Sequence, residues 1–333
     1  MNPLELIAVF EKIKHLRVGV IGDFAVDFFF NLQTRTGEFW VETPKVGFWA
    51  IGAKASLGGA GNVVQNLSAL GVQHLKVFGC VGDDVFGREI QHLFRKVNVN
   101  IDALQILSNG WDTCTYTKPM SAEGEENRLD FGTDNVLSEN TFEQMVRDLE
   151  AALPQLDVLI INQQFANPLL NPSRINALNR LSSRFPNCQV LADLRDFGGN
   201  IRGATLKVNT DEIARILKVS VSKDLGTCIT QSRQLQAIIK APVLITRGEK
   251  GILYVDKDET CQVRVIPLEG PLDTVGAGDT VVAAFAAARG VNSSIFEALQ
   301  IANLAAVVTV QKLQQTGTAC LEEILEVIAV HKS

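Results

Sequence analysis

The sequence predicts an α/β fold: a doubly wound, mostly parallel β-sheet with helices on both faces and a small β-strand lid. Short apolar runs of strand length alternate with longer amphipathic stretches along most of the 333 residues. Two polar, strand-like segments interrupt this alternation, at about 31–57 and 101–135. We therefore expect a single domain over residues 1–333, with a lid formed by these two segments.

The expected elements follow one another in a regular order. A helix at 3–14 has apolar residues at helical spacing, and a buried strand at 17–22 ends in glycine. Further strands are expected at 75–81, 157–162, 188–193, 205–208 and 242–246, with hairpin strands around 251–266. Further helices are expected at 61–70, 86–97, 140–152, 172–184, 210–218, 230–239, 277–289, 294–312 and 321–330. This alternation favours a parallel sheet.

The composition excludes several classes of protein. Hydrophobic residues make up 46% and charged residues 20% of the chain, which allows a large buried core. The net charge of −6 argues against nucleic acid and anionic membranes as partners. The N-terminus lacks the apolar run of a signal peptide, and no apolar stretch reaches the roughly 18 residues of a membrane span. We therefore expect a cytoplasmic protein.

Neither cysteine nor histidine indicates a metal site. The six cysteines are scattered, without a CxxC or Cys/His cluster, so free thiols are expected and zinc is not. None of the four histidines follows a predicted strand, and surface or capping roles are favoured for them.

The predicted topology indicates where chemistry should lie. In doubly wound sheets, ligands bind beyond the carboxyl ends of the strands. The segments that follow predicted strands in this chain are 22–27, 193–197, 209–212, 246–251 and 273–279.

The strongest signal is the run DTVGAGDT at 273–280, which precedes a helix that is apolar nearly all round and hence buried. Small residues at the start of this helix leave backbone amides exposed, and these amides and the helix dipole bind anions. A carboxylate beside an anion site, here Asp279, suits proton abstraction from an attacking hydroxyl. A simple helix-capping role is the alternative, but the flanking glycines, which let a ligand approach the backbone, favour function.

This run resembles the second signature of the ribokinase (PfkB) family, Asp-Thr-x-Gly-Ala-Gly-Asp. The run GGAGN at 58–62 is similar to the first signature, and the motifs follow in the family's order from about residue 17 to 325. The resemblance implies a ribokinase-like fold and an ATP-dependent sugar kinase that uses Mg²⁺. Many relatives also use a monovalent cation such as K⁺.

The resemblance also implies roles for individual residues. Asp279 is the implied base, and the amides of Gly276, Ala277 and Gly278 are the implied anion hole for the transferred phosphoryl group. The expected substrate-binding residues are Asp23, Asp27, Gly58, Gly59, Asn62, Arg128 and Arg195. The expected nucleotide-binding residues are Asn209, Glu212, Thr246, Arg247, Gly248, Gly251, Thr274 and Asn303. Asn209 and Glu212 would position Mg²⁺ through water, and Asp273 would lie near a monovalent cation.

Within that family, the chain is most similar to the heptose-7-phosphate kinase domain. The similar phrases are GDFAVD, RLDFG at 128–132, RGATLKVNTDE at 202–212 and KLQQTGT at 312–318. Those kinases have Asp-Pro-Lys where this chain has Asp193-Leu194-Arg195, and they lack the tryptophan-rich lid at 40–49. Both departures lie where substrate is chosen, so the sugar stays open.

Other functions fit the sequence less well than a sugar kinase. Asp196-Phe197-Gly198 matches a protein-kinase motif, but no HRD-type loop precedes it. There is no P-loop, and the glycines at 59–61 lack the third glycine of a dinucleotide loop. A catalytically idle sensor of the same fold remains an alternative, as does a kinase for a nucleoside or a sugar acid.

Several site residues also have simpler interpretations. Arg128 and Asp130 could form only an exposed ion pair, and Asp23 could bond only to turn amides. Arg195 could bind a substrate phosphate, the ATP phosphates, or only neighbouring aspartates. The lid tryptophans favour a homodimer formed through the lid over a role in the core.

Overall fold

The computed structural model describes residues 1–33, 48–313 and 315–331. Its main sheet has nine strands in the order β13-β12-β11-β10-β9-β8-β1-β4-β5. These strands are β1 (Arg17–Gly22), β4 (His74–Gly82), β5 (Leu104–Leu107), β8 (Val158–Gln163), β9 (Gln189–Leu194), β10 (Thr205–Asn209), β11 (Val243–Thr246), β12 (Ile252–Val255) and β13 (Thr260–Val263). All neighbours are parallel except at β12, which is antiparallel to both of its partners.

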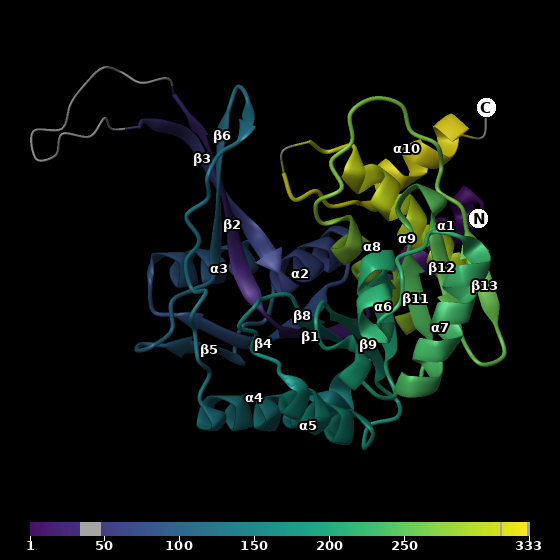
Figure 1. Cartoon of the computed structure of the whole chain (residues 1–333), viewed down its shortest axis with the longest axis horizontal. Coiled ribbons are helices and arrows are strands. Elements are labelled where there is room, and N and C mark those ends of the chain that lie inside the picture. The colour runs from purple at the N-terminus through teal and green to yellow at the C-terminus, as the bar shows by residue number, and fades with distance from the viewer. Residues whose placement is uncertain (34–47, 314, 332–333) are drawn as a thin grey trace, which may run out of the picture.

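Helices cover both faces of this sheet (Figure 1), which confirms the predicted doubly wound α/β fold. Alternate residues of β8 enter two large cores, with Val158 and Ile160 in one and Leu159 and Ile161 in the other. The first core includes residues of α1 (Pro3–Ile13), α2 (Ala60–Ala69), α3 (Val85–Lys96), α8 (Ala277–Gly290), α9 (Ile295–Val310) and α10 (Leu321–His331). The second includes residues of α4 (Glu139–Ala152), α5 (Pro172–Ser182), α6 (Thr210–Leu217) and α7 (Leu225–Ile239).

Most predicted elements lie within a few residues of their observed bounds, and α7 is the clearest exception. It begins at Leu225 rather than at residue 230, because the side chain of Asp224 accepts a hydrogen bond from the amide of Thr227. This contact caps the helix one and a half turns earlier than its apolar pattern indicates.

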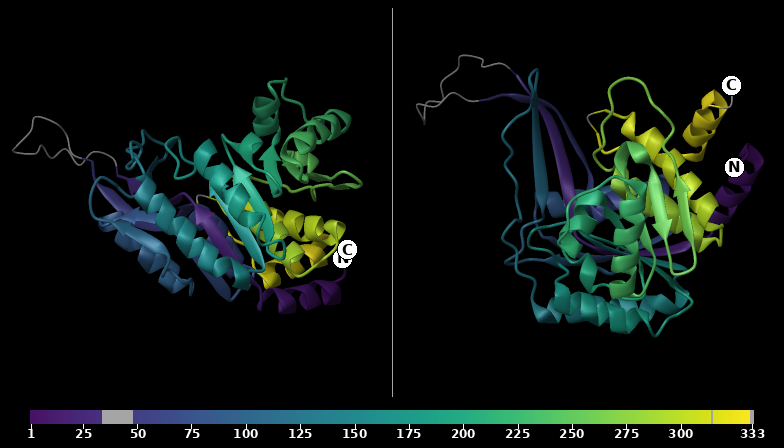
Figure 2. Two further views of the ribbon diagram at one scale, coloured as in Figure 1. Left: turned by 90° about the horizontal axis from the view of Figure 1, so that it is seen from below. Right: turned by 45° about the vertical axis from the view of Figure 1, so that its right-hand side comes forward.

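A second, four-stranded sheet has the order β3-β2-β6-β7 and extends away from the main sheet (Figure 2). Its strands are β2 (Phe24–Leu32), β3 (Ala50–Gly59), β6 (Thr115–Ser121) and β7 (Gly124–Glu125). Residues 34–47 of the first expected lid segment, including Trp40, lie outside the described residues.

This second sheet corresponds to the predicted lid and is called the lid below. It differs from the prediction at two places. It begins at Phe24, directly after β1, because β2 pairs with β3 from Phe24 onward. The stretch Leu104–Leu107, which was expected in the lid, instead pairs in parallel with β4 at the edge of the main sheet. Leu104 is 8% exposed and belongs to the first core, so its burial explains this placement.

Candidate active site

Four residues at the carboxyl ends of neighbouring strands form a row across the main sheet. Gly22 of β1 pairs with Asn162 of β8, Asn162 pairs with Asp193 of β9, and Asp193 pairs with Lys207 of β10. Partners in register point to the same face of a sheet, and this face carries α2 and α8. Asn162, Asp193 and Lys207 therefore place polar side chains on this face, and Lys207 lies next to Gly278 at the N-terminus of α8.

The N-terminus of α8 has the geometry of an anion site. Its cap residue is Gly276, whose φ of 79° is a left-handed conformation that glycine adopts without strain. The amide of Ala277 donates to the carbonyl of Thr274 at 3.2 Å, whereas the amides of Gly278 and Asp279 have no acceptor among the described residues. These two amides can therefore bind an anion in front of the helix.

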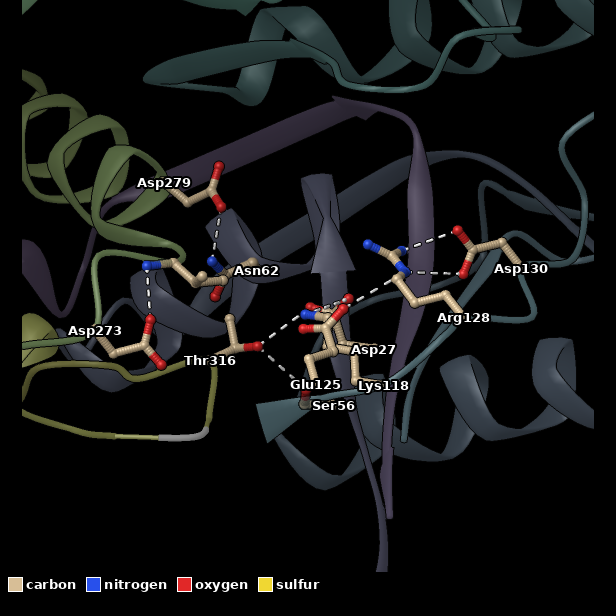
Figure 3. A network of polar contacts seen from close by, with 11 residues as sticks. Asp27, Ser56, Asn62, Lys118, Glu125, Arg128, Asp130, Asp273, Asp279 and Thr316 are labelled. Carbon is tan, nitrogen blue, oxygen red and sulfur yellow. Dashed lines mark hydrogen bonds and ion pairs between the residues drawn. The ribbon is translucent and has the colours of Figure 1, made fainter. Parts of the chain in front are cut away.

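Asp279 lies in the first turn of α8 and is not its cap residue. Its Oδ2 atom accepts a hydrogen bond of 2.7 Å from Nδ2 of Asn62, a residue of the adjacent helix α2 (Figure 3). Burial and the charge of Asp193 raise the pKa of Asp279 to about 7, although the Asn62 bond and Lys207 act in the opposite direction. A carboxyl group with a pKa near neutrality can accept a proton efficiently at physiological pH.

Lys207 is a cation of the site that the sequence motifs did not reveal. Its Nζ atom lies 3.2 Å from Oδ2 of Asp193, and both side chains are almost fully buried. A Cβ atom added to Gly278 would lie 2.9 Å from the same Nζ atom, so the ammonium group lies against the tip of α8. Burial alone would lower the pKa of Lys207, but Asp193, Glu212 and Asp279 outweigh it and raise the pKa. A charged lysine thus lies beside the two free amides.

Asp27 of β2 faces the same region from the lid. Its carboxylate accepts a hydrogen bond of 3.2 Å from Oγ1 of Thr316 and forms an ion pair of 3.2 Å with Lys118 of β6 (Figure 3). The Oγ atom of Ser56 lies 3.4 Å from the hydroxyl of Thr316. Gly58 makes room for this carboxylate, since a Cβ atom at that position would lie 3.1 Å from Cγ of Asp27. This cluster offers donors and acceptors that suit the hydroxyls of a sugar.

Asp23, which was expected to bind substrate, is bonded to backbone amides. Its oxygen atoms accept hydrogen bonds from the amides of Gln164, Phe165 and Leu169, and the side chain is buried. Burial raises its pKa to about 6, although these amides act in the opposite direction. Asp23 therefore fixes the loop after β8, which matches the turn-amide interpretation. Gly59, with a φ of 56°, caps α2 and passes close to the carbonyl of Asp23.

The two expected arginines differ in their contacts. Arg128 forms an ion pair of 3.0 Å with Asp130 (Figure 3). Its guanidinium lies over the ring of Tyr116 at 4.9 Å. Arg195 is exposed and has no ion pair within the described ranges, and its charge acts on Asp23 and Tyr116. Arg195 is thus the freer cation for an anionic ligand.

Asn209 and Glu212 form a capping box at the start of α6. The side chain of Asn209 accepts from the amides of Asp211 and Glu212, while Oε2 of Glu212 accepts from the amide of Asn209 at 2.7 Å. The other carboxylate oxygen of Glu212 accepts no hydrogen bond from the described residues, and burial raises the pKa of this group. In the part of the chain described, no three His, Cys, Asp or Glu side chains gather to hold a metal ion. Asn209 and Glu212 therefore fit a Mg²⁺ ion that keeps most of its water ligands.

The expected nucleotide loop follows β11. Thr246 ends this strand, and the buried Arg247 donates to the carbonyls of Lys223 and Lys250, so its guanidinium supports the loop rather than facing solvent. Gly248 and Gly251 both have positive φ, at 57° and 84°. The three other expected residues, Thr274, Asn303 and Asp273, lie outside this loop. Asn303 of α9 donates to the carbonyl of Arg264 at 3.1 Å. The side chain of Asp273 accepts from the amide of Val275, and the neighbouring Thr274 is exposed.

Two cavities elsewhere lack this combination of groups. One of about 340 Å³ lies at the amino ends of β8, β9 and β10, where Gln189, Thr205 and Arg289 line it without any carboxylate. The other, of about 510 Å³, is lined by five aspartates and no cation. Among the helices of the described ranges, none has the length and hydropathy needed to span a bilayer. The tip of α8 therefore remains the best candidate for chemistry.

Known proteins resemble this chain over most of its length. The model of a family described as pfkB family carbohydrate kinase matches residues 50–322. The bifunctional protein HldE of Paramagnetospirillum magneticum is 30% identical over 336 residues, which cover 98% of this chain and 66% of that protein. HldE of Aliarcobacter butzleri is 31% identical over 284 residues, which cover 83% of this chain and 57% of that protein. The chain thus spans only part of the length of these relatives.

Solved structures share the fold at lower identity. Arabidopsis thaliana ribokinase complexed with ribose and ATP has a TM-score of 0.71 at 19% identity and covers 94% of this chain and 99% of its own. Escherichia coli phosphofructokinase-2 in complex with potassium has a TM-score of 0.76 at 17% identity, with coverage of 96% and 100%. These matches confirm the ribokinase-like fold that the motifs implied.

Proposed function

Because this chain belongs to the pfkB family of carbohydrate kinases, whose members are phosphotransferases with an alcohol acceptor, we propose that Asp279 is the base of its reaction. The reaction moves the γ-phosphoryl group of ATP to a hydroxyl of a sugar or sugar phosphate. The observation that carries this assignment is the position of the Asp279 carboxyl, held by Asn62 next to the free amides of α8. ATP as donor is consistent with a cytoplasmic enzyme.

The proposed reaction is an in-line displacement. Asp279 takes the proton of the acceptor hydroxyl while that oxygen bonds to the γ-phosphorus, and the bond to the β–γ bridging oxygen breaks to release ADP. The amides of Gly278 and Asp279 and the ammonium group of Lys207 stabilise the charge on the moving phosphoryl group. Bound Mg²⁺ would neutralise charge on the ATP phosphates, with Asn209 and Glu212 orienting its water ligands. A monovalent cation near Asp273 belongs to the same proposal.

The acceptor is proposed to bind between α8 and the lid. Asp27, Thr316 and Asn62 offer groups for its hydroxyls, and Arg195, which has no ion pair among the described residues, offers a charge for a phosphate that the acceptor already carries. The resemblance to heptose-7-phosphate kinases and the similarity to HldE proteins support an acceptor of that type.

A panel of sugars, sugar phosphates, nucleosides and sugar acids, screened for ADP release with Mg²⁺ and ATP, tests this proposal. We expect turnover with a sugar phosphate. Binding of sugar or ATP without ADP release from any member of the panel would instead identify a sensor.

The activity should depend on pH through Asp279. The base must be ionised, and its pKa is raised to about 7, so kcat/KM should rise as the pH increases through that value and level off above it. Measurement of kcat/KM from about pH 5 to 9 with excess coupling enzymes checks this. A profile that is already flat below pH 6 would contradict it.

The lid is proposed to form a homodimer. Among the described strands, its edge strand β3 has no partner on its outer side, and Phe48, Trp49 and Ile51 are 62%, 47% and 52% exposed in or next to that strand. We expect a dimer by light scattering at micromolar concentration, and we expect Ile51→Glu to weaken it at least about tenfold. Val136→Glu alters an equally apolar residue, 84% exposed and outside this sheet, and should leave the dimer intact. A monomeric wild-type chain would refute the proposal.

A further inference from the structure

A chain of buried polar groups extends behind Asp279. Asn66, one turn after Asn62 on α2, donates from Nδ2 to the side-chain oxygen of Asn62 at 3.0 Å and to its backbone carbonyl at 2.9 Å. The hydroxyl of Thr280 on α8 donates to Oδ1 of Asn66 at 2.8 Å. All three side chains are at most 1% exposed, so water does not compete for these bonds.

This chain fixes which end of the Asn62 amide faces Asp279. An amide has a donor end and an acceptor end, and Asn66 occupies the acceptor end of Asn62. The NH₂ group of Asn62 is thereby left to face the carboxylate. Asn66 cannot turn over in the same way, since its oxygen would then face the backbone carbonyl of Asn62. The Thr280 hydroxyl lies closer to Oδ1 of Asn66, at 2.8 Å, than to its other acceptor, the carbonyl of Gly276, at 3.2 Å.

We propose that Asn66 and Thr280 are positioning residues that hold the amide of Asn62 with its donor end toward Asp279. This inference rests on the proposed role of Asp279 as base. The other charged groups that act on Asp279 are Asp193 of β9, Lys207 of β10 and Asp27 of β2. Asp193 and Asp27 disfavour the ionised base, so the donor from Asn62 adds to the effect of Lys207 in keeping it ionised.

The test uses Asn66→Leu, Thr280→Val and the conservative Thr280→Ser. Leu and Val keep volume but remove the fixing contacts, so Asn62 can present its oxygen to Asp279 and disfavour ionisation. We expect kcat/KM to fall roughly 10- to 100-fold at pH 7 and the acidic limb of its pH profile to move up by about one unit. Thr280→Ser should restore both. Ser232→Ala, which removes a buried hydroxyl that donates to the carbonyl of Cys228 on α7, is the matched control and should leave the profile unchanged.

Carboxyl ¹³C NMR of Asp279 in the ATP-free protein follows the titration of this carboxyl group directly, without turnover. An acidic limb and a carboxyl titration identical to wild type in Thr280→Val would overturn the inference, and so would a loss of activity in Ser232→Ala equal to that in Thr280→Val. Should Asn66→Leu fail to fold, the two Thr280 variants still decide. If Asp279→Asn is inactive while these variants behave as wild type, only the positioning role is wrong. If Asp279→Asn is fully active, the proposed function itself is wrong.

Discussion

Asp279→Asn should lower kcat by about 10²–10⁴-fold, with little change in the KM for ATP. The asparagine keeps the shape of the side chain and its bond from Asn62, but it cannot accept the proton of the acceptor hydroxyl. ADP release with the best acceptor from the substrate panel measures this. Undiminished turnover would remove Asp279 from the mechanism.

Asp84→Asn provides the matched control for this experiment. Asp84 caps α3 by accepting from the amide of Gly87 at 2.7 Å, a bond that asparagine can keep. Its second oxygen accepts from the amide of Thr113 at 2.7 Å, a bond that asparagine loses. The control makes the same chemical change at a helix N-terminus outside the proposed site, so its kcat should stay close to that of wild type.

Asp279→Asn should also be more stable than wild type at alkaline pH. The pKa of Asp279 is about 7 in the folded protein, against about 3.9 in an unfolded chain. The stability that its protonation contributes is fully present below the unfolded value and is lost as the pH rises through 7. Asparagine carries no charge at any pH, so the difference in Tm between variant and wild type should grow from pH 5 to pH 8. A constant difference would mean that burial does not penalise this carboxylate.

Much of the fold could be predicted because hydrophobic periodicity reports burial directly. The strand Arg17–Gly22 matches the expected range, and α8 extends one residue beyond it. The errors arose where long-range pairing decides: Leu104–Leu107 looked like part of the lid until its partner β4 was known. The start of α7 depended on the Asp224 cap, which an apolar pattern does not show.

The candidate site could be predicted only where its residues share a contiguous motif. Asp279 and Asn62 lie in the two glycine-rich runs, and they are in contact through a bond of 2.7 Å. Lys207 and Lys118 stand alone in their strands, and their partners Asp193 and Asp27 are 14 and 91 residues away along the chain. A lysine as the single charged residue of a short strand such as TLKVN was the available signal for Lys207, because a buried charge requires a partner.

Lys207→Met should affect both catalysis and stability. Removal of one preorganised donor beside the phosphoryl group should lower kcat on the order of 10²–10³-fold. The change also leaves the buried carboxylate of Asp193 without its cation, which should cost about 3–5 kcal/mol of unfolding free energy. Denaturant unfolding and ADP release measure the two effects. Lys14→Met, which breaks an exposed ion pair with Glu11, should cost only about 0–1 kcal/mol and leave kcat unchanged.

The double variant Asp193→Asn/Lys207→Met separates these two effects. With the carboxylate neutralised, no unpaired charge remains buried, so most of the lost stability should return. The missing ammonium group at the tip of α8 is not restored, so kcat should stay low. Recovery of kcat together with stability would mean that Lys207 only neutralises Asp193. Continued low kcat in a stable protein would mean that the charge of Lys207 acts on the reacting phosphoryl group, as the position of its ammonium group beside Gly278 indicates.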